Sequence, residues 1–332
     1  MIKHEKDKLA KGSYVTYRPD IAILDCTVRD GGIINDHKFE DGFVKAVYDT
    51  CVEAGVQYME LGYKASKKIF APAKFGKWKF CDEDDIRRIV GDNKTSLKLS
   101  VMADADRTDY HEDILPKEKS VVDCVRVATY ITQIPMAIDM IKDAHDKGYE
   151  TTVNLMAVST VQDRELDDAL HELAKSPVDV IYLVDSFGSM YSEQVRDLTL
   201  AFMQAVEGTN KKIGIHTHNN QQLAYSNTIE ALIVGASMLD ATINGMGRGA
   251  GNCPLELLIG FLKNPRYRLR PVLKCVQDVF LPMKKQMEWG YEIPYMITGQ
   301  LNLHPKSAMK CRAGDKPDDY VGFYDQTMQE ES

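Results

Sequence analysis

From residue 21 onward, short runs rich in β-branched residues alternate with longer stretches of helical periodicity. The β-rich runs, such as "IAILDC" and "DVIYLVDS", cover residues 21–26, 58–63, 97–103, 123–130, 151–158, 179–186, 212–218 and 238–245. Amphipathic segments lie between most of them, at residues 39–54, 135–147, 163–175, 192–207 and 223–234. Strands that alternate with helices form right-handed βαβ units and a parallel sheet. An open doubly wound sheet usually has fewer strands and an early Gly-rich phosphate turn. We therefore predict an α/β fold, a (β/α)8 TIM barrel.

The regular alternation ends after Leu262, and this sets the predicted domain boundaries. We predict an N-terminal extension at 1–20, a TIM-barrel catalytic domain at 21–264 and a C-terminal extension at 265–332. Residues 271–290 have helical periodicity, whereas 291–314 have the pattern of loops and short turns, and 322–332 the polarity of a frayed tail. We expect this short extension of helix and loop to pack on or near the barrel mouth.

Composition and charge exclude several classes of function. The net charge of −8, without any basic block, argues against a nucleic-acid partner. Seven cysteines without a CxxC pair indicate free thiols in a reducing compartment. The charged start "MIKHEKDKLAKGSY" is not a signal peptide, and no apolar run is long enough to span a bilayer. We therefore expect a cytoplasmic protein that has no membrane contact.

Two of the eight histidines, His216 and His218, stand one residue apart at the end of the apolar run "KIGIHTH". On a β-strand, residues i and i+2 point to the same face, so both imidazoles project together. The carboxyl ends of the strands carry the active site in α/β barrels. Two imidazoles at this spacing can bind one divalent cation. The alternative is a pair of polar histidines that are hydrogen-bonded to their neighbours.

A third candidate ligand follows the first predicted strand, in "LDCTVRDGG". We expect Asp25, Thr27 and Arg29 to share one face of that strand, with Asp30 turning over the barrel mouth. Gly31 permits backbone dihedrals that other residues resist. One carboxylate and two imidazoles suit Mn²⁺, Mg²⁺, Zn²⁺ or Co²⁺, of which we favour Mn²⁺ or Mg²⁺. The alternative for Asp30 is a turn carboxylate that caps the next segment.

Four motifs in order resemble the metal-dependent DRE-TIM superfamily. They are "DCTVRDGG" on the first strand, "MELGY" on the second, "HTHNN" on the seventh and "NGMGRGAGNCPLE" after the eighth. This superfamily includes 4-hydroxy-2-oxoacid aldolases, hydroxymethylglutaryl-CoA lyase, and the isopropylmalate and homocitrate synthases. The sequence is most similar to the 4-hydroxy-2-oxovalerate aldolases, and the resemblance covers roughly residues 21–262.

The resemblance implies a role for each residue that matches a motif. Asp30, His216 and His218 match the metal ligands of the family. Arg29 matches the arginine that faces the substrate oxygen, and Glu60 matches the glutamate that holds this arginine. The predicted substrate-binding residues are Arg29, Arg126, Gly249 and Asn252, of which the last two lie in the Gly-rich loop after the eighth strand.

The chain departs from the aldolase pattern at the general base. The aldolases have a histidine three residues after the metal aspartate, where this chain has Ile33. Tyr130, at the end of the fourth β-rich run, and His304, in the C-terminal extension, are the predicted catalytic replacements. His37 and Tyr63 are further candidates, and a structural role is an alternative for each of these residues.

These features predict a divalent-metal-dependent carbon–carbon lyase. It would cleave a 4-hydroxy-2-oxoacid into pyruvate and an aldehyde, because a cation stabilises the pyruvate-type enolate. The alternative is a synthase that condenses an acyl-CoA with a 2-oxoacid, although synthases usually carry a longer C-terminal region. A metal-dependent hydrolase, a Schiff-base aldolase using Lys98 and a barrel that only binds a ligand are further rivals. We expect a 2-oxoacid substrate and a homodimer, and related aldolases also suggest an aldehyde dehydrogenase partner.

Overall fold

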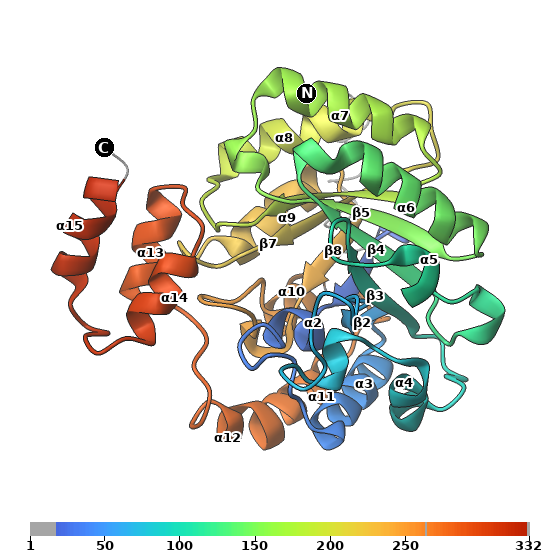
Figure 1. Cartoon of the computed structure of the whole chain (residues 1–332), viewed down its shortest axis with the longest axis horizontal. Coiled ribbons are helices and arrows are strands. Elements are labelled where there is room, and N and C mark those ends of the chain that lie inside the picture. The colour runs from blue at the N-terminus through green and yellow to red at the C-terminus, as the bar shows by residue number, and fades with distance from the viewer. Residues whose placement is uncertain (1–17, 263, 331–332) are drawn as a thin grey trace.

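The computed structural model describes residues 18–262 and 264–330. Most of the predicted N-terminal extension therefore lies outside the described residues. Eight parallel strands close into a barrel in sequence order, and β1 pairs with β8 to complete it (Figure 1). The strands are β1 (Ala22–Asp25), β2 (Tyr58–Tyr63), β3 (Lys98–Asp104), β4 (Cys124–Thr129), β5 (Glu150–Leu155), β6 (Val180–Asp185), β7 (Lys212–Thr217) and β8 (Met238–Ala241). The predicted TIM barrel is confirmed.

Helices lie between the strands and cover the outside of the barrel (Figure 1). They are α2 (Thr27–Gly31), α3 (Asp41–Ala54), α4 (Glu83–Val90), α5 (Tyr110–Asp113), α6 (Ile134–Asp146), α7 (Asp163–Lys175), α8 (Ser192–Ala205), α9 (Ala224–Val234) and α10 (Leu255–Leu262). Helix α7 shows why they pack: it buries Leu166, Leu170 and Leu173, which share one face, and exposes acidic residues on the other. None of the described helices is both long and apolar enough to cross a membrane.

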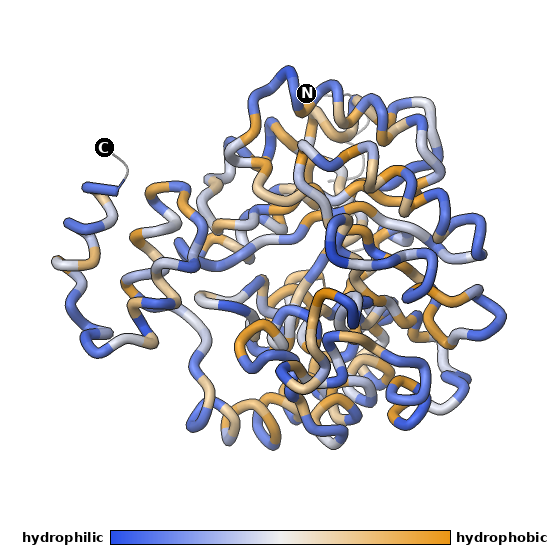
Figure 2. Tube along the Cα trace, in the orientation of Figure 1, coloured by the Kyte–Doolittle hydropathy of each residue, from blue (hydrophilic) through white to orange (hydrophobic). Residues whose placement is uncertain are grey.

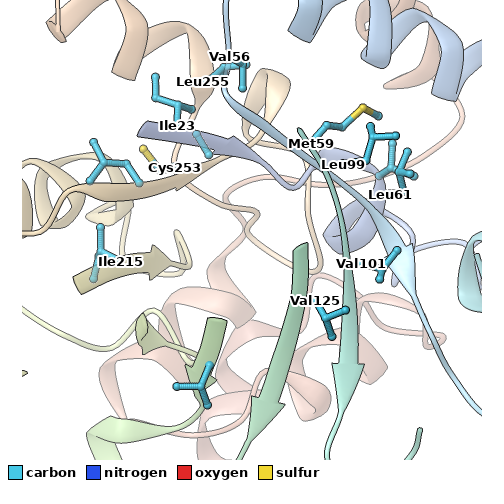
Figure 3. Packing of buried hydrophobic residues seen from close by; sticks show 14 of the residues in the cluster. Ile23, Val56, Met59, Leu61, Leu99, Val101, Val125, Ile215, Cys253 and Leu255 are labelled. Carbon is cyan, nitrogen blue, oxygen red and sulfur yellow. The ribbon is translucent and has the colours of Figure 1, made fainter. Parts of the chain in front are cut away.

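The strands separate two packed layers, because successive side chains point to opposite sides of the sheet. Leu99 and Val101 of β3 and Val125 of β4 belong to the hydrophobic layer between the barrel and its helices (Figure 3). Burying each such side chain stabilises the fold by roughly 1.5–3 kcal/mol. The alternate residues fill the barrel interior. There, a Cβ atom on Gly214 would lie 2.5 Å from the ring of Tyr182, so only glycine leaves room for this ring.

The first strand is shorter than we predicted. β1 ends at Asp25, and Thr27–Gly31 forms the one-turn helix α2. The Asp25 carboxylate accepts hydrogen bonds from the Thr27 backbone N–H at 3.2 Å and from its hydroxyl at 2.7 Å. These local bonds favour a turn over continued pairing. The expectation that Asp25, Thr27 and Arg29 share one strand face is therefore wrong, although Arg29 and Asp30 still reach the barrel mouth.

The C-terminal extension is more helical than we predicted. It contains α11 (Leu269–Cys275), a π-helix (Val276–Phe280), α12 (Leu281–Met283), α13 (Ile293–Gln300), α14 (Lys306–Arg312) and α15 (Tyr320–Glu330). The expectations of loops at 291–314 and of a frayed tail at 322–332 are thus wrong for most of these residues. Tyr295 and Ala308 are buried against Ala250 of a barrel loop, so tertiary contacts stabilise these short helices. Helices α13 to α15 stand beside the barrel (Figure 1), with polar and apolar turns alternating along them (Figure 2).

Candidate metal centre and active site

A cavity of about 270 Å³ opens at the carboxyl ends of the strands. Six of the predicted site residues line it: Arg29, Asp30, Tyr130, His216, His218 and His304. They come from α2, from the ends of β4 and β7, and from the segment between α13 and α14. The structure therefore brings residues from the start, middle and end of the chain to one hollow at the barrel mouth.

Asp30, His216 and His218 meet at the floor of this cavity. Each offers one ligand atom, and these atoms lie within 4.8 Å of one another. His218 Nδ1 lies 4.0 Å from Asp30 Oδ2, and all three side chains are buried. Because a carboxylate and two imidazoles this close can share one cation, the residues present fit a divalent metal ion.

The protonation of this triad favours a cation. Burial, followed by the charge of Arg248, lowers the pKa of His218 well below its ordinary value, so its ring is neutral at pH 7. Burial alone would raise the pKa of Asp30, but the charge of Arg29 holds it below its ordinary value. His216 Nδ1 lies 2.9 Å from Asp240 Oδ2. A carboxylate at this nitrogen fixes the tautomer and leaves Nε2 with a free lone pair for a metal.

A buried network of charges supports the triad from below. Arg29 donates from Nε to Glu60 at 2.7 Å and from Nη1 to Asp30 at 2.6 Å. Arg126 donates to the same Glu60 oxygen at 3.1 Å and to Asp240 at 2.6 Å. A continuous series of hydrogen bonds thus connects Asp30 to Asp240, which contacts His216. Such a network fixes the orientation of the groups above it.

Four predicted residues lie outside the lining of the cavity. Arg126 is fully buried, and its guanidinium stacks 4.5 Å from the ring of Tyr182. We expected Arg126 to contact a substrate, but the structure places it beneath the mouth. There its guanidinium donates hydrogen bonds to Glu60 and Asp240. Glu60 is equally buried and acts on Arg29.

The two residues of the Gly-rich loop differ in position. Gly249 has a φ of +58° and faces α13, since a Cβ on it would lie 3.1 Å from the ring of Tyr295. It packs against α13 and is not among the residues that line the cavity, so the substrate-binding expectation for it stays a prediction. The Asn252 amide is buried and donates to Asp30 Oδ2 at 2.5 Å. Asn252 thus touches the carboxylate ligand.

Of the predicted catalytic replacements, Tyr130 lines the cavity but is 41% exposed. His304 lines it from the C-terminal extension. Burial, followed by the charge of Arg248, lowers the pKa of His304 to about 4. Its Nδ1 accepts the backbone N–H of Lys306 at 3.1 Å, and its Nε2 lies 3.4 Å from Nη1 of Arg248, which can only donate. Both ring nitrogens of His304 therefore face hydrogen-bond donors, so His304 is poorly placed to take a proton from a substrate.

Sequence reasoning missed several polar residues of the cavity wall, and Asp104 and Asn154 are two of them. Asp104 ends β3, and Asn154 lies near the end of β5. The buried Asn154 Oδ1 has no hydrogen-bond partner among the residues that the structure describes. Both residues lie on the inward face of their strands, a position that period-two alternation predicts once the strand ends are known. In contrast, the further candidate His37 does not line the cavity and packs edge-on to Tyr63, with ring centroids 5.3 Å apart.

Comparisons with known proteins match the barrel along most of its length. A family model described as HMGL-like matches residues 20–274. The oxaloacetate decarboxylase of Mycobacterium tuberculosis is 30% identical over 253 residues, which cover 75% of this chain and 71% of that protein. The 4-hydroxy-2-oxovalerate aldolase of Pelotomaculum thermopropionicum is 27% identical over 269 residues, which cover 81% and 78%.

Solved structures agree with the barrel architecture. The N-terminal domain of a Bacteroides vulgatus protein provisionally named an aldolase aligns with a TM-score of 0.76 and 28% identity, covering 87% of this chain and 96% of that one. Hydroxymethylglutaryl-CoA lyase from Pseudomonas aeruginosa aligns with a TM-score of 0.65 and 16% identity, covering 79% and 93%, which shows a shared fold. The resemblance to the DRE-TIM superfamily is thereby confirmed, and this chain belongs to the HMGL-like family.

Proposed function

We propose that the protein is a divalent-metal-dependent carbon–carbon lyase that cleaves a 4-hydroxy-2-oxoacid into pyruvate and an aldehyde. The observation that carries the proposal is the convergence of Asp30, His216 and His218 beside Arg29 in one cavity. The names of the aldolase and decarboxylase relatives support it, because both reactions break a carbon–carbon bond of a 2-oxoacid.

The residues around the triad have the chemistry that such a cleavage needs. A divalent cation held by Asp30, His216 and His218 would act as a Lewis acid on the keto oxygen of the substrate. Arg29 lines the cavity, and its Nη2 donates to no described residue, so it can donate to the developing enolate oxygen. Removing one such donor typically costs about 3 kcal/mol in the transition state. Glu60 keeps the guanidinium in place.

We include the C-terminal extension in the proposed active site. His304, Lys306 and Met309 of this extension line the cavity together with barrel residues. His304 lies beside Arg248, with Nε2 3.4 Å from Arg248 Nη1, and Tyr130 offers a hydroxyl at the rim. The proposed division therefore keeps the catalytic domain at 21–264 and the extension at 265–332, of which His304, Lys306 and Met309 complete the mouth.

Decarboxylation of a 2-oxoacid with a 3-carboxyl group is the second candidate. Ile33 lines the cavity at the position where the aldolases have a histidine, and its side chain is apolar and cannot accept a proton. Loss of CO₂ produces the same enolate without requiring removal of a hydroxyl proton. The Schiff-base alternative has less support. Lys98 begins β3 at the opposite end of the barrel, where it pairs with Glu150.

The test compares three reactions after metal removal with EDTA and reloading with Mn²⁺ or Mg²⁺. Pyruvate release from 4-hydroxy-2-oxopentanoate, CO₂ release from oxaloacetate above the metal-only background, and CoA release from acetyl-CoA with a 2-oxoacid are measured in parallel. We expect metal-dependent pyruvate release that His218→Ala abolishes and that His111→Ala, at an exposed histidine, leaves unchanged. CoA release without pyruvate release would support the synthase alternative. Activity that survives EDTA and is trapped by borohydride would contradict the metal mechanism.

A further inference from the structure

Strand β3 ends at Asp104, whose side chain points into the barrel mouth. Leu99 and Val101 belong to the layer between the barrel and its helices. Met102 and Asp104 occupy the alternate positions and therefore point inward. Both line the cavity that contains the proposed metal ligands. A carboxylate thus reaches the substrate side of the cavity from a rigid strand.

Asp104 differs from the other carboxylates around the centre because it has no partner. Asp30, Glu60 and Asp240 each accept a hydrogen bond from an arginine at 2.6 to 2.7 Å. In the part of the chain that the structure describes, the Asp104 carboxylate makes no hydrogen bond or ion pair, and only burial and more distant charges act on it. Its oxygens are therefore free to bind a substrate hydroxyl group.

The surroundings of Asp104 suit proton transfer. The charged groups that act on it from neighbouring elements are Lys79, Arg107, Asp106 and Arg29. Lys79 is buried, with Nζ held 4.3 Å from the ring centroid of Tyr63. Burial raises the pKa of Asp104 above its ordinary value, because none of these cations contacts the carboxylate. A carboxyl group with a raised pKa accepts and returns protons more readily near neutral pH.

The other candidate proton carriers are less suitable. Both ring nitrogens of His304 face donors, namely the backbone N–H of Lys306 at 3.1 Å and Arg248 Nη1 at 3.4 Å. His37 does not line the cavity, and burial lowers its pKa to about 3. Burial raises the pKa of Tyr63 above its ordinary value, so its phenol keeps its proton at pH 7. Among the residues that line the cavity, Asp104 therefore combines access, a free acceptor and a pKa raised above its ordinary value.

We propose that Asp104 is the general base, and then the general acid, of the lyase reaction. This inference rests on the proposed function. The Asp104 carboxylate takes the proton of the substrate's 4-hydroxyl group as the C3–C4 bond breaks. The electrons of the O–H bond form the aldehyde C=O bond, and those of the C3–C4 bond form the enolate. The protonated Asp104 then returns its proton to C3, and this produces the methyl group of pyruvate.

The test uses the full-length protein loaded with Mg²⁺ and two partial reactions. Pyruvate release from 4-hydroxy-2-oxopentanoate reports the base step, and exchange of the pyruvate methyl protons in D₂O, measured by mass spectrometry, reports the acid step. The variants are Asp104→Asn, Asp104→Ala and the control Asp168→Asn. Asp168 is exposed on α7 and does not line the cavity. Circular dichroism and Mn²⁺ affinity show whether each variant keeps its fold and metal site.

We expect Asp104→Asn to lower both rates by about 100- to 10,000-fold, as for loss of a general acid–base group. Metal affinity should not change, and Asp168→Asn should keep both rates. Added formate should restore part of the activity of Asp104→Ala, because a small carboxylate can occupy the vacated space. If both Asp104 variants keep both rates, or if Asp104→Ala is folded and inactive but formate does not restore it, the inference is wrong. If the unmodified protein performs neither partial reaction with any metal, the proposed function itself fails, and the inference fails with it.

Discussion

Replacing Arg126 by methionine tests the buried charge network most severely. Arg126 is fully buried and bridges Glu60 and Asp240, with N–O distances of 3.1 and 2.6 Å. Methionine has a similar length but no charge. The substitution would therefore leave Glu60 with Arg29 as its remaining cation and would leave Asp240 with only an imidazole partner. The change acts on stability without altering any residue that lines the cavity.

The expected cost follows from the burial of both carboxylates. Breaking a buried ion pair by removing one partner destabilises a protein by about 3–5 kcal/mol, because an uncompensated charge is left inside. For a chain of this size, that cost corresponds to a fall in Tm of roughly 4–7 °C. The measurement is thermal unfolding followed by circular dichroism in EDTA, so that metal binding does not contribute. Arg164→Met, at an exposed residue of α7, is the matched control.

A double variant separates the charge effect from lost packing. Arg126→Met combined with Asp240→Asn removes both partners of the 2.6 Å contact. It should be destabilised by less than the sum of the two single changes, because no unpaired carboxylate remains at that contact. If Arg126→Met melts within experimental error of the Arg164 control, or if the two single effects simply add, the network does not stabilise the barrel as argued.

Three further predictions concern the barrel interior. Burial raises the pKa of Asp25 to about 7, so the native state holds a proton that the unfolded chain releases above about pH 4. The free energy of unfolding should therefore fall as the pH rises between these two values. Asp25→Asn should remove this part of the pH dependence, measured by urea titrations at pH 4 and pH 8. Asp240→Asn should weaken Mn²⁺ binding by about 10- to 100-fold, because His216 loses the carboxylate that orients it. Calorimetry measures the affinity, and an unchanged affinity would contradict this role of Asp240. Gly214→Ala should cost about 1–3 kcal/mol, since its Cβ would lie 2.5 Å from Tyr182, and a neutral result in urea unfolding would show that the interior adapts.

The barrel was predictable because its signals are local and repeated. Each β-rich run of the sequence overlaps one observed strand, and the histidine pair at the end of β7 faces one side because the side-chain period is two. The one-turn helix α2 was not predictable in this way. It depends on the Asp25 side chain, whose hydrogen bonds to Thr27 compete with strand pairing.

The roles of buried and C-terminal residues were harder to predict because they depend on distant contacts. Arg126 lies on an inward face, as expected, but its depth below the mouth is set by the layers of the closed barrel. Helix α13 has a weakly amphipathic sequence, and its position depends on contact of Tyr295 with a barrel loop. Asp104 carries no motif, so only the structure shows that its carboxylate reaches the cavity without a partner.

The central claim is that Asp30, His216 and His218, which lie far apart in the sequence, hold one cation at the barrel mouth. Isothermal titration of the EDTA-treated protein with Mn²⁺ tests it most directly, using Asp30→Ala, His216→Ala and His218→Ala beside the exposed control His111→Ala. We predict a single saturable site in the unmodified protein and in the control, and its loss in each of the three variants while their circular dichroism spectra stay unchanged. Equal Mn²⁺ binding by the unmodified protein and all three variants would contradict the claim.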